Sequence, residues 1–484
     1  MRRLIAWRLG AALVVMALAR AMSAEPQTLT ITDDPALDRA MAEARAEFMA
    51  GKPFDRLDAV ILVAQPDGSW KRGSHNPEAL AYPASCVKFP FMVAAMHWCK
   101  TNGFPPDHLD HCVGPMVRVS DNVQTGVVVD IVTSTTNIAD LTTSADPRYA
   151  AWYEARLYFE KYFSERGLLA GQTLVHKTYP TNSGEWPAGA EKVAREHRGM
   201  NMMKPSASAE LMVRVAKGLL EPQAREYMMG LLQHNPWKAS SVAGFGLPPG
   251  SRYFNKTGLA YDTLEDIAYI VLPNGREVVL AMFSNAFRPP YSRDPSPYDG
   301  SQLGGFAELL LEKAGLLEGC PPKVIVDNSD PGFRTTGDWE KSTSGTDKLG
   351  ADFMRKQRGR ALATAAWELS VPEAGYYEVC VRQPQSDEYA SDAPWRVIHA
   401  DGESTFSLDQ QKVGGRWRLL GTFRFEKGTG RVEVSDRVTS ATQYVVADAV
   451  KATRWPDKVV EVPGLAVPAL PRPWEPAPDT KEVE

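Results

Sequence analysis

The segment from Tyr82 to Trp98 constrains the fold of this chain more than any other stretch. It reads Tyr-Pro-Ala-Ser-Cys-Val-Lys-Phe-Pro-Phe-Met over residues 82–92 and continues almost without charge. A helix that is apolar on every side is buried inside a domain. Ser85 and Lys88 are three positions apart and share one helix face. A buried lysine is unfavourable without a partner or a purpose, and activation of a serine nucleophile is such a purpose. The alternative is that Ser85 caps the helix and Lys88 extends to solvent.

Length and composition set the broad class of the protein. A chain of 484 residues is expected to form two or three domains. The formal net charge of −5, without a block of basic residues, excludes a nucleic-acid partner. Basic Arg2, Arg3 and Arg8 precede a short apolar run and small residues that end at Ala24. Residues 1–24 are therefore interpreted as a signal peptide, which predicts export to the periplasm or outside the cell, with no membrane span after cleavage.

Residues 25–318 are predicted to form an α+β domain. A strand meander is expected at residues 252–260, 264–272 and 276–285, because Pro273-Asn274-Gly275 is a strong hairpin turn. A further hairpin is expected at 58–64 and 69–73. Periodic apolar residues predict the helices, which we place at 35–50, 116–132, 149–168, 204–220 and 300–317.

Composition changes at residues 319–323, which we interpret as a linker. Residues 324–455 then alternate apolar and polar positions in short runs, as in an all-β sandwich. These runs are 363–369, 376–382, 395–399, 417–425 and 431–434. Residues 456–484 are rich in proline and charge and are predicted to be disordered.

Two other features remain open at this stage. Five cysteines leave at least one unpaired, with Cys99–Cys112 and, less strongly, Cys320–Cys380 as candidate disulfides. The run Asp107-His108-Leu109-Asp110-His111 offers metal-ligating side chains, but it falls in a polar loop without a supporting ligand pattern. We therefore expect neither a metal nor another cofactor.

Three short motifs occur in order in the first domain. They are Ser85-Cys86-Val87-Lys88, Ser120-Asp121-Asn122 and Lys256-Thr257-Gly258. The first begins a buried helix, the second follows a loop into a helix, and the third lies on a strand. Each motif alone is weak, but this combination on these elements is specific.

By these motifs the region from Pro35 to Leu317 resembles the serine β-lactamase and penicillin-binding-protein superfamily, and most of all its class A β-lactamase-related serine hydrolases. The resemblance implies an antiparallel sheet flanked by helices, and it assigns roles to the motif residues. Ser85 attacks a carbonyl, Lys88 accepts or relays its proton, and Ser120 passes a proton to the leaving nitrogen. Asn122 binds the substrate amide, Lys256 and Thr257 hold its carboxylate, and Gly258 lets it lie against the strand. The N–H groups of Ser85 and Leu259 form the oxyanion hole.

The chain departs from this family in two places. The interval between Ser85 and Ser120 is shorter than in typical class A enzymes, so part of the helical subdomain is missing. The Glu-x-x-Leu-Asn pattern that supplies the deacylating base is also absent from residues 176–187. Glu185 is the best candidate for this base, with Glu191 and Glu196 behind it. An exposed loop carboxylate is an equal alternative for Glu185.

The second domain resembles the golvesin C-terminal-like module, which is similar to carbohydrate-binding sandwiches. The resemblance rests on residues 325–333, 392–394, 415–421 and 444–450. It implies binding of cell-surface polysaccharide. Trp339, Trp395 and Trp417 are candidates for stacking on sugar, and a place in the sandwich core is their alternative.

These observations lead to one main hypothesis and one alternative. The first is an exported, monomeric serine acyl-hydrolase that acts on β-lactams or D-Ala-D-Ala-type peptides. The alternative is a penicillin- or peptidoglycan-binding protein that keeps the pocket but turns over slowly or not at all.

Overall fold

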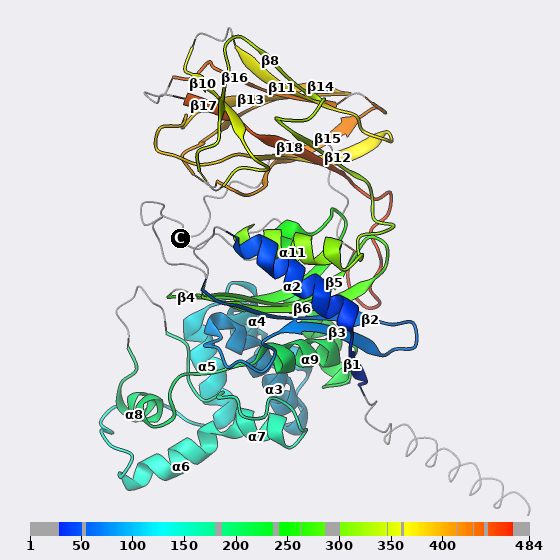
Figure 1. Ribbon diagram of the computed structural model, residues 1–484. Helices are drawn as coiled ribbons and strands as arrows, with labels where there is room; N and C mark the ends of the chain where they lie inside the picture. Colours follow the sequence, from blue (N-terminus) through cyan, green and yellow to red (C-terminus); the bar gives the residue numbers. More distant parts are fainter. Residues whose placement is uncertain are drawn as a thin grey trace, which may run out of the picture.

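The computed structural model describes residues 29–50, 55–179, 186–235, 242–261, 263–285, 301–345, 347–359, 363–412, 414–428, 430–439 and 444–467. Figure 1 shows a sheet covered by helices on both faces, and a second region of strands beside it. This arrangement confirms the predicted α+β domain followed by a β-sandwich. The predicted signal peptide lies outside the described residues.

A six-stranded sheet forms the centre of the first domain, in the order β1-β3-β2-β6-β5-β4. All neighbours are antiparallel except β1 and β3. The strands are β1 (Ile31–Asp33), β2 (Leu57–Ala64), β3 (Trp70–His75), β4 (Arg252–Ala260), β5 (Thr263–Val271) and β6 (Glu277–Ser284). The turn at Pro273-Asn274-Gly275 joins β5 to β6 with Gly275 at φ 83°, so the predicted meander is confirmed.

Helices bury both faces of this sheet. On one face lie α2 (Pro35–Met49) and α11 (Ser301–Lys313), which share a core with alternate residues of β2, β5 and β6. On the other lie α3 (Lys88–Thr101) and α9 (Pro205–Ala216), which pack on the intervening residues of the same strands. Because both faces are covered, β2 is buried along nearly its whole length.

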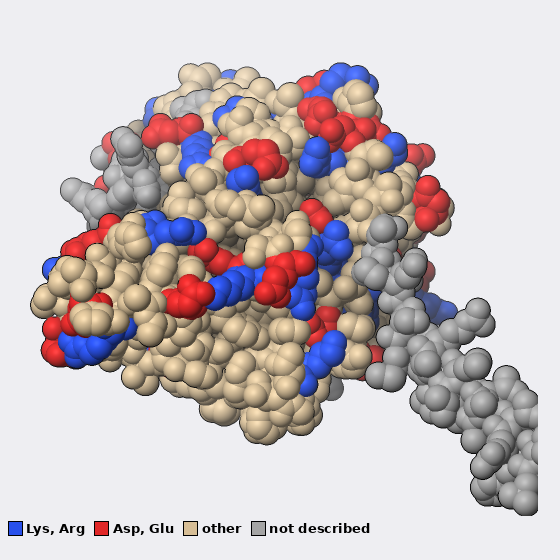
Figure 2. All heavy atoms as spheres, turned by 90° about the horizontal axis from the view of Figure 1, so that it is seen from below, with Lys and Arg blue, Asp and Glu red and all other residues tan. Residues whose placement is uncertain are grey.

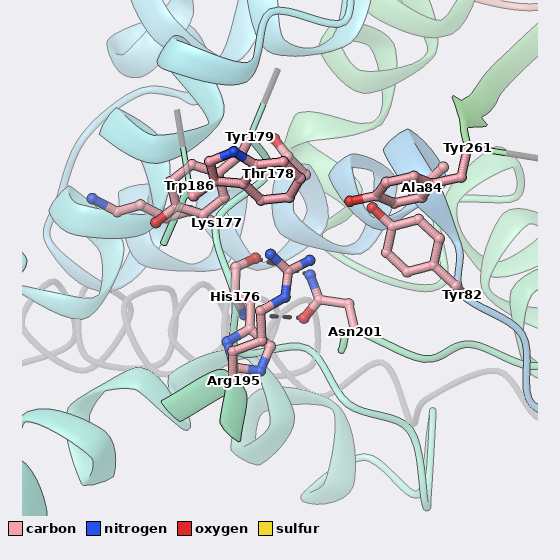
Figure 3. Close-up of a pocket in the computed structure, with 10 residues that line it drawn as sticks. All are labelled: Tyr82, Ala84, His176, Lys177, Thr178, Tyr179, Trp186, Arg195, Asn201 and Tyr261. Carbon is pink, nitrogen blue, oxygen red and sulfur yellow. Dashed lines mark hydrogen bonds between the residues drawn. The ribbon is translucent and has the colours of Figure 1, made fainter. Parts of the chain in front are cut away.

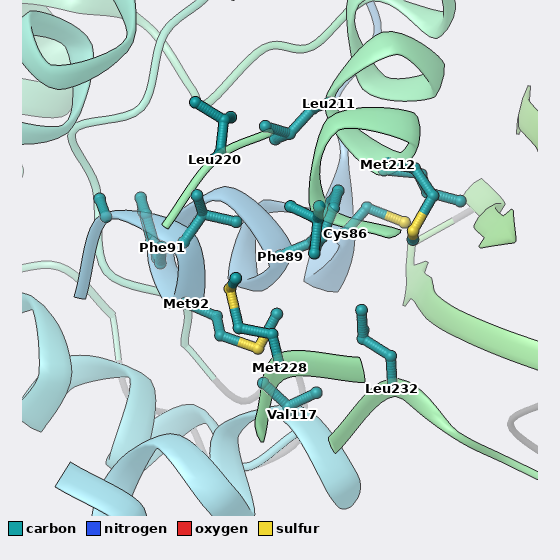
Figure 4. Packing of buried hydrophobic residues seen from close by; sticks show 14 of the residues in the cluster. Cys86, Phe89, Phe91, Met92, Val117, Leu211, Met212, Leu220, Met228 and Leu232 are labelled. Carbon is teal, nitrogen blue, oxygen red and sulfur yellow. The ribbon is translucent and has the colours of Figure 1, made fainter. Parts of the chain in front are cut away.

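Helix α3 is the most deeply buried helix segment of the site region. Its residues from Lys88 to Met96 are all buried. Figure 4 shows Phe89, Phe91 and Met92 packed among residues of α4, α9 and α10. This confirms the interpretation of the apolar run, with one refinement. Residues Ala84–Val87 form a separate 3-10 turn, η1, and the α-helix begins at Lys88.

The remaining helices surround α3 at the side of the sheet that carries the site (Figure 1). They are η2 (Pro106–Leu109), α4 (Asp110–Arg118), α5 (Asn122–Thr133), α6 (Pro147–Arg156), α7 (Tyr158–Ser164), α8 (Gly189–Arg198), η3 (Pro222–Ala224) and α10 (Arg225–Leu232). The short η4 (Ala243–Gly246) is the exception, because it packs against α11 on the other face of the sheet.

Two segments predicted as single helices are each divided in two. The expected helix at 116–132 is interrupted between α4 and α5, because the carbonyl of Pro115 accepts hydrogen bonds from both Val119 and Asp121. This closes α4 and leaves Ser120 in the left-handed region at φ 59°. The expected helix at 149–168 is divided at Leu157, between α6 and α7.

The second domain contains three antiparallel sheets, in the orders β17-β10-β9, β14-β13-β16-β11-β8 and β15-β12-β18-β7. The strands are β7 (Lys323–Asp327), β8 (Phe333–Thr336), β9 (Glu340–Ser342), β10 (Phe353–Gln357), β11 (Thr364–Leu369), β12 (Gly375–Arg382), β13 (Ala393–His399), β14 (Gly402–Leu408), β15 (Arg418–Phe425), β16 (Gly430–Ser435), β17 (Tyr444–Ala447) and β18 (Ala449–Arg454). The inward residues of the two larger sheets form one core around the stacked rings of Trp367 and Trp395, whose centroids are 5.3 Å apart.

The two domains are joined by ion pairs on the outer side of α11. Glu308 accepts from Lys451 at 3.0 and 3.1 Å and from Lys323 at 3.3 Å. Both lysines belong to the sandwich, and although desolvation opposes it, their charges lower the pKa of the partly buried Glu308. The sandwich therefore lies on the α2–α11 face, away from the Ser85 side of the sheet.

The chain then returns to the first domain after the last strand. Val462 is buried in the same core as α3. Arg252 donates to the carbonyls of Val460 at 3.2 Å and Ala466 at 2.9 Å, and Arg225 donates to that of Pro463 at 3.0 Å. The prediction of disorder from residue 456 is therefore wrong for residues 456–467. Proline-rich composition does not show that the backbone carbonyls of this segment accept from two arginines, or that Val462 is buried in the core.

The structure also corrects the disulfide predictions. All five cysteines are free thiols, and Cys86, Cys99, Cys112 and Cys380 are buried. Spacing alone did not exclude pairing, because it carries no information on the direction of the side chains. Within the described ranges, no helix has both the length and the apolar character needed to cross a bilayer.

Candidate active site

Ser85 and Lys88 meet where η1 passes into α3. The Lys88 Nζ lies 3.0 Å from the Ser85 Oγ. Lys88 is completely buried, whereas Ser85 is partly exposed. No side chain caps α3. The alternative in which Ser85 caps the helix and Lys88 reaches solvent is therefore wrong. Ala84, directly before Ser85, has φ 42°, a conformation that stores strain and occurs often at functional sites.

Ser120 and Asn122 are brought to Lys88 by the break between α4 and α5. The Lys88 Nζ lies 3.1 Å from the Ser120 Oγ and 2.8 Å from the Asn122 Oδ1, and it also donates to the Ser120 carbonyl. With Ser85, four oxygens lie within hydrogen-bond distance of one nitrogen. An ammonium has only three N–H groups, whereas a neutral amine has a lone pair that can accept from a hydroxyl.

Lys256, Thr257 and Gly258 lie on β4, which runs beside η1. The Lys256 Nζ donates to the Ser120 Oγ at 3.1 Å, so Ser120 connects the two lysines. The Thr257 hydroxyl donates to the Glu265 carbonyl at 3.0 Å, and a substrate carboxylate would have to compete for that proton. A Cβ on Gly258 would lie 2.5 Å from the Pro83 carbonyl. Only glycine therefore permits this close approach of β4 to η1.

The electrostatics of the site oppose protonation of both lysine amines. Burial, and then the nearby charge of Lys256, lower the pKa of Lys88 well below its ordinary value. Burial also lowers the pKa of Lys256, to about 8. Among the described residues, no carboxylate forms a hydrogen bond or ion pair with either amine. Desolvation without a carboxylate partner is the condition under which lysine becomes a base near neutral pH.

The three carboxylates considered as the deacylation base lie in different environments. Glu185 lies outside the described residues. Glu191 is buried on α8 and accepts from Arg156 at 2.5 Å. Glu196 is exposed on the same helix, 3.8 Å from Lys192. Neither Glu191 nor Glu196 has a hydrogen bond to Ser85 or Lys88. The chemistry that this arrangement supports directly is acylation of Ser85.

A pocket opens beside Ser85, and sequence reasoning did not find it. It is lined by Tyr82, Ala84, His176, Lys177, Thr178, Tyr179, Trp186, Arg195, Asn201 and Tyr261. Figure 3 shows Tyr82 and Tyr261 on one side, Trp186 and Tyr179 on another, and Arg195 beside Asn201 between them. The signal in the sequence was one arginine on the amphipathic α8, which is common on solvated helices and did not indicate a site.

The segment considered for metal binding is helical, in η2 and the start of α4, and not the polar loop that was expected; its side chains have structural contacts. His108 stacks on Phe104 with ring centroids 3.9 Å apart, and Asp110 accepts from the Tyr227 hydroxyl at 2.8 Å. In the described part of the chain, no group of three His, Cys, Asp or Glu side chains is arranged to hold a metal ion.

The surface near α6 and α7 carries mixed charge. Figure 2 views the molecule from that side and shows acidic and basic side chains interspersed. Arg148 pairs with Asp140 and Asp146 there, and Lys161 pairs with Glu154. Exposed pairs of this kind contribute little stability, and this face offers no patch of a single sign.

Two of the three tryptophans considered for sugar binding are occupied by other contacts. Trp395 is 1% exposed and stacks on Trp367 in the sandwich core. Trp417 is covered by Lys451, whose Nζ lies 4.9 Å from the ring centroid at the domain interface. Trp339 packs at the edge of the core and is partly exposed. Stacking on sugar is thus wrong for Trp395, and Trp339 is the best placed of the three.

Comparisons with known proteins agree with this two-domain organisation. The family model described as "Beta-lactamase enzyme family" matches residues 105–297, and that of the "Golvesin C-terminal domain" matches residues 324–454. The curated golvesin of Dictyostelium discoideum is 31% identical over 442 residues, which cover 90% of this chain and 75% of golvesin. Xanthan lyase of Bacillus sp. (strain GL1) is 36% identical over 134 residues, 27% of this chain and 14% of the lyase.

Among solved structures, the β-lactamase from Sphaerobacter thermophilus is similar at 19% identity with a TM-score of 0.42, covering 59% of this chain and 99% of that one. The chain belongs to the golvesin family, and it joins a domain of the β-lactamase enzyme family to a golvesin C-terminal domain.

Proposed function

We propose that this protein is an exported serine acyl-hydrolase of the β-lactamase class that forms an acyl-enzyme on Ser85. Its substrates are β-lactams or D-Ala-D-Ala-type peptides and amides. One observation carries the proposal. The buried Lys88 Nζ lies 3.0 Å from the Ser85 Oγ, without a carboxylate to hold its charge.

The proposed steps conserve protons throughout. Ser85 Oγ attacks the substrate carbonyl while its proton passes to the neutral Lys88 amine. Ser120, within 3.1 Å of both lysines, relays a proton to the leaving nitrogen as the amide bond breaks. The N–H groups of Ser85 and Leu259 stabilise the oxyanion. Water then cleaves the Ser85 ester and restores the hydroxyl. Asn122 and Lys256 hold the substrate amide and carboxylate.

The sandwich domain is proposed to attach the enzyme to cell-surface polysaccharide, as the golvesin C-terminal domain and the match to a lyase of the polysaccharide xanthan suggest. Its contacts with α11 support a fixed placement on the face away from Ser85. A polymer held by the sandwich would then leave the Ser85 pocket open to a second, smaller substrate.

A second candidate function is that of a penicillin- or peptidoglycan-binding protein with slow turnover. It is favoured by the contacts of the carboxylates on α8. Glu191 is held by Arg156, and Glu196 is exposed beside Lys192. Neither forms a hydrogen bond with Ser85 or Lys88, which supports slow deacylation. An acyl-enzyme would then form at an ordinary rate and persist.

One experiment tests both candidates. The full chain is incubated with a fluorescent penicillin, and the intact mass is followed over time. We expect a one-to-one adduct in the wild type and in Ser164→Ala, which removes an exposed hydroxyl on α7, and no adduct in Ser85→Ala. Labelling that persists in Ser85→Ala would disprove the mechanism. An adduct that decays within minutes indicates a hydrolase, whereas one that is stable for hours indicates the binding protein.

A further inference from the structure

We propose that the pocket beside Ser85 selects acyl donors whose side chain carries both an aromatic ring and a carboxylate, with Arg195 as the carboxylate's partner. This inference rests on the proposed function and names the substrate class of the same site. The residues of this pocket are separate from Asn122, Lys256 and Thr257. It is therefore an additional subsite for the acyl side chain.

The first argument is the chemistry of the walls. Four of the ten lining residues are aromatic: Tyr82, Tyr179, Trp186 and Tyr261. The rings of Tyr82 and Tyr261 lie 5.8 Å apart, and Trp186 is 66% exposed. An exposed tryptophan at the edge of a pocket is an unfavourable apolar surface until a ligand covers it. Flat aromatic walls are suited to a flat apolar group.

The second argument is the charge of the pocket. Burial lowers the pKa of His176 to about 4 and raises that of Tyr82 to about 12, so both are neutral near pH 7. Lys177 is paired with Asp130 at 2.6 Å. Arg195 remains as a positive charge.

No ion pair or hydrogen bond joins the Arg195 guanidinium to another group in the described part of the chain, although the Arg195 carbonyl accepts from Gly199 at the end of α8. The acidic residues of its own helix do not compensate it, because Glu191 pairs with Arg156 and Glu196 faces Lys192. Figure 3 shows the guanidinium directed into the space between the aromatic walls. Arginine in such a setting favours a carboxylate, which it can bind with two parallel hydrogen bonds.

The third argument is distance along the chain from the nucleophile. Tyr82 and Ala84 belong to the segment that carries Ser85, and Tyr261 directly follows β4. We therefore assign this pocket to the acyl part of the substrate, the part that Ser85 attacks. Asn201 makes the opposite wall rigid, since its side chain bonds the backbone of Val175 and His176 at 2.9–3.1 Å.

The test compares two probes, benzylpenicillin and carbenicillin, which differ by one carboxylate next to the phenyl ring. The acylation rate constant of the full chain is measured for each by competition with the fluorescent penicillin. In Arg195→Gln, we expect the carbenicillin-to-benzylpenicillin ratio to fall about tenfold from its wild-type value, because one charge-assisted contact is lost. Lys192→Gln, which removes an exposed charge from the same helix, is expected to keep the wild-type ratio.

Each outcome has a separate meaning. An adduct with benzylpenicillin and an unchanged ratio in Arg195→Gln would overturn the subsite and leave the proposed function intact. No adduct with either probe would overturn both. An equal decrease of the acylation rate constant with both probes would indicate that Arg195 has a structural role, which also contradicts the proposal. Calorimetric titration of both probes into Ser85→Ala, with and without Arg195→Gln, measures the same selectivity without acylation.

Discussion

Two clusters of buried cations in the first domain differ in their partners. Lys88 and Lys256 contact hydroxyl, carbonyl and amide oxygens. Arg156, equally buried, contacts the carboxylates of Glu191 and Asp130 at 2.5 and 2.8 Å. In the first cluster, burial disfavours the protonated form of the two lysines. In the second cluster, the positive charge of Arg156 is paired with two carboxylates.

The comparison teaches what makes a buried cation reactive. Desolvation acts on both clusters, but only the lysines lack a carboxylate that would restore the charged form. A lysine left in that state can accept a proton from Ser85. The Arg156 cluster instead joins α5, α6 and α8 and so fixes the wall of the pocket, a structural role.

The largest expected effect is on the rate of acylation in Lys88→Met. Loss of the base should slow penicillin acylation by about 10²–10⁴-fold. The free energy of unfolding should stay the same or rise, since methionine replaces a buried amine by an apolar group of similar length. Stopped-flow labelling and urea unfolding measure the two quantities. A large loss of stability in this variant would make Lys88 a structural residue and would remove the difference between the clusters.

The next effect is on stability, in Arg156→Met. Removal of Arg156 leaves the buried Glu191 carboxylate with Lys177 at 3.8 Å in place of the arginine at 2.5 Å, which should lower the free energy of unfolding by about 3–5 kcal/mol. The double variant Arg156→Met, Glu191→Gln should recover part of this loss, because the orphaned charge is also removed. Urea unfolding of the four proteins gives the coupling energy. Equal losses for Lys88→Met and Arg156→Met would contradict the comparison.

The elements that the sequence predicted best are those defined by local pattern. The meander was located because Pro273-Asn274-Gly275 specifies its turn, and α3 because its apolar run has no polar face. The three motifs also met as expected, with Ser120 joining Lys88 to Lys256. Each of these predictions depends on residues close in the sequence, or on motifs that carry their own structural context.

The features that the sequence did not predict depend on distant contacts. Arg195 lines the pocket together with residues 176–179, which belong to a different segment, and no local pattern records this. The segment 456–467 has the composition of a disordered tail, but Val462 finds an apolar site and Arg252 supplies two donors. The division of two helices was missed because Pro115 accepts two hydrogen bonds in a way that periodicity does not show.

A smaller effect is expected in the pH dependence of acylation and of penicillin binding. This dependence should come from the two lysines and not from Arg156. Acylation should decrease at low pH as Lys88 becomes protonated, and binding of a carboxylate-bearing penicillin should weaken above pH about 8 as Lys256 loses its charge. Lys256→Arg should move the alkaline limb upward, because a guanidinium stays charged. An alkaline limb that stays in place in this variant would exclude Lys256 as its cause.

Lys256 should also make the free energy of unfolding depend on pH, and the direction of this dependence follows from its pKa. Its folded-state pKa of about 8 lies below the ordinary value of 10.5, so between these values the folded state binds fewer protons than the unfolded state. The free energy of unfolding should therefore rise with pH in this window. Lys256→Arg should reduce the rise, and the part that remains is assigned to Lys88, whose pKa is also lowered. A curve that is equally steep in this variant would exclude Lys256 as a contributor.

The smallest effect should come from the outer member of the paired cluster, in Lys177→Met. Its Nζ lies 2.6 Å from the Asp130 carboxylate, but both side chains are partly exposed, at 15% and 26%. Solvent screens such a pair, and Asp130 keeps its contact with Arg156, so no charge is orphaned. The aliphatic stem packs beside Gly126, where methionine preserves the contact. We expect a loss of about 1 kcal/mol in the free energy of unfolding, measured by urea unfolding beside Arg156→Met. A loss as large as that of Arg156→Met would mean that Lys177, rather than the fully buried arginine, is the cation on which this cluster depends.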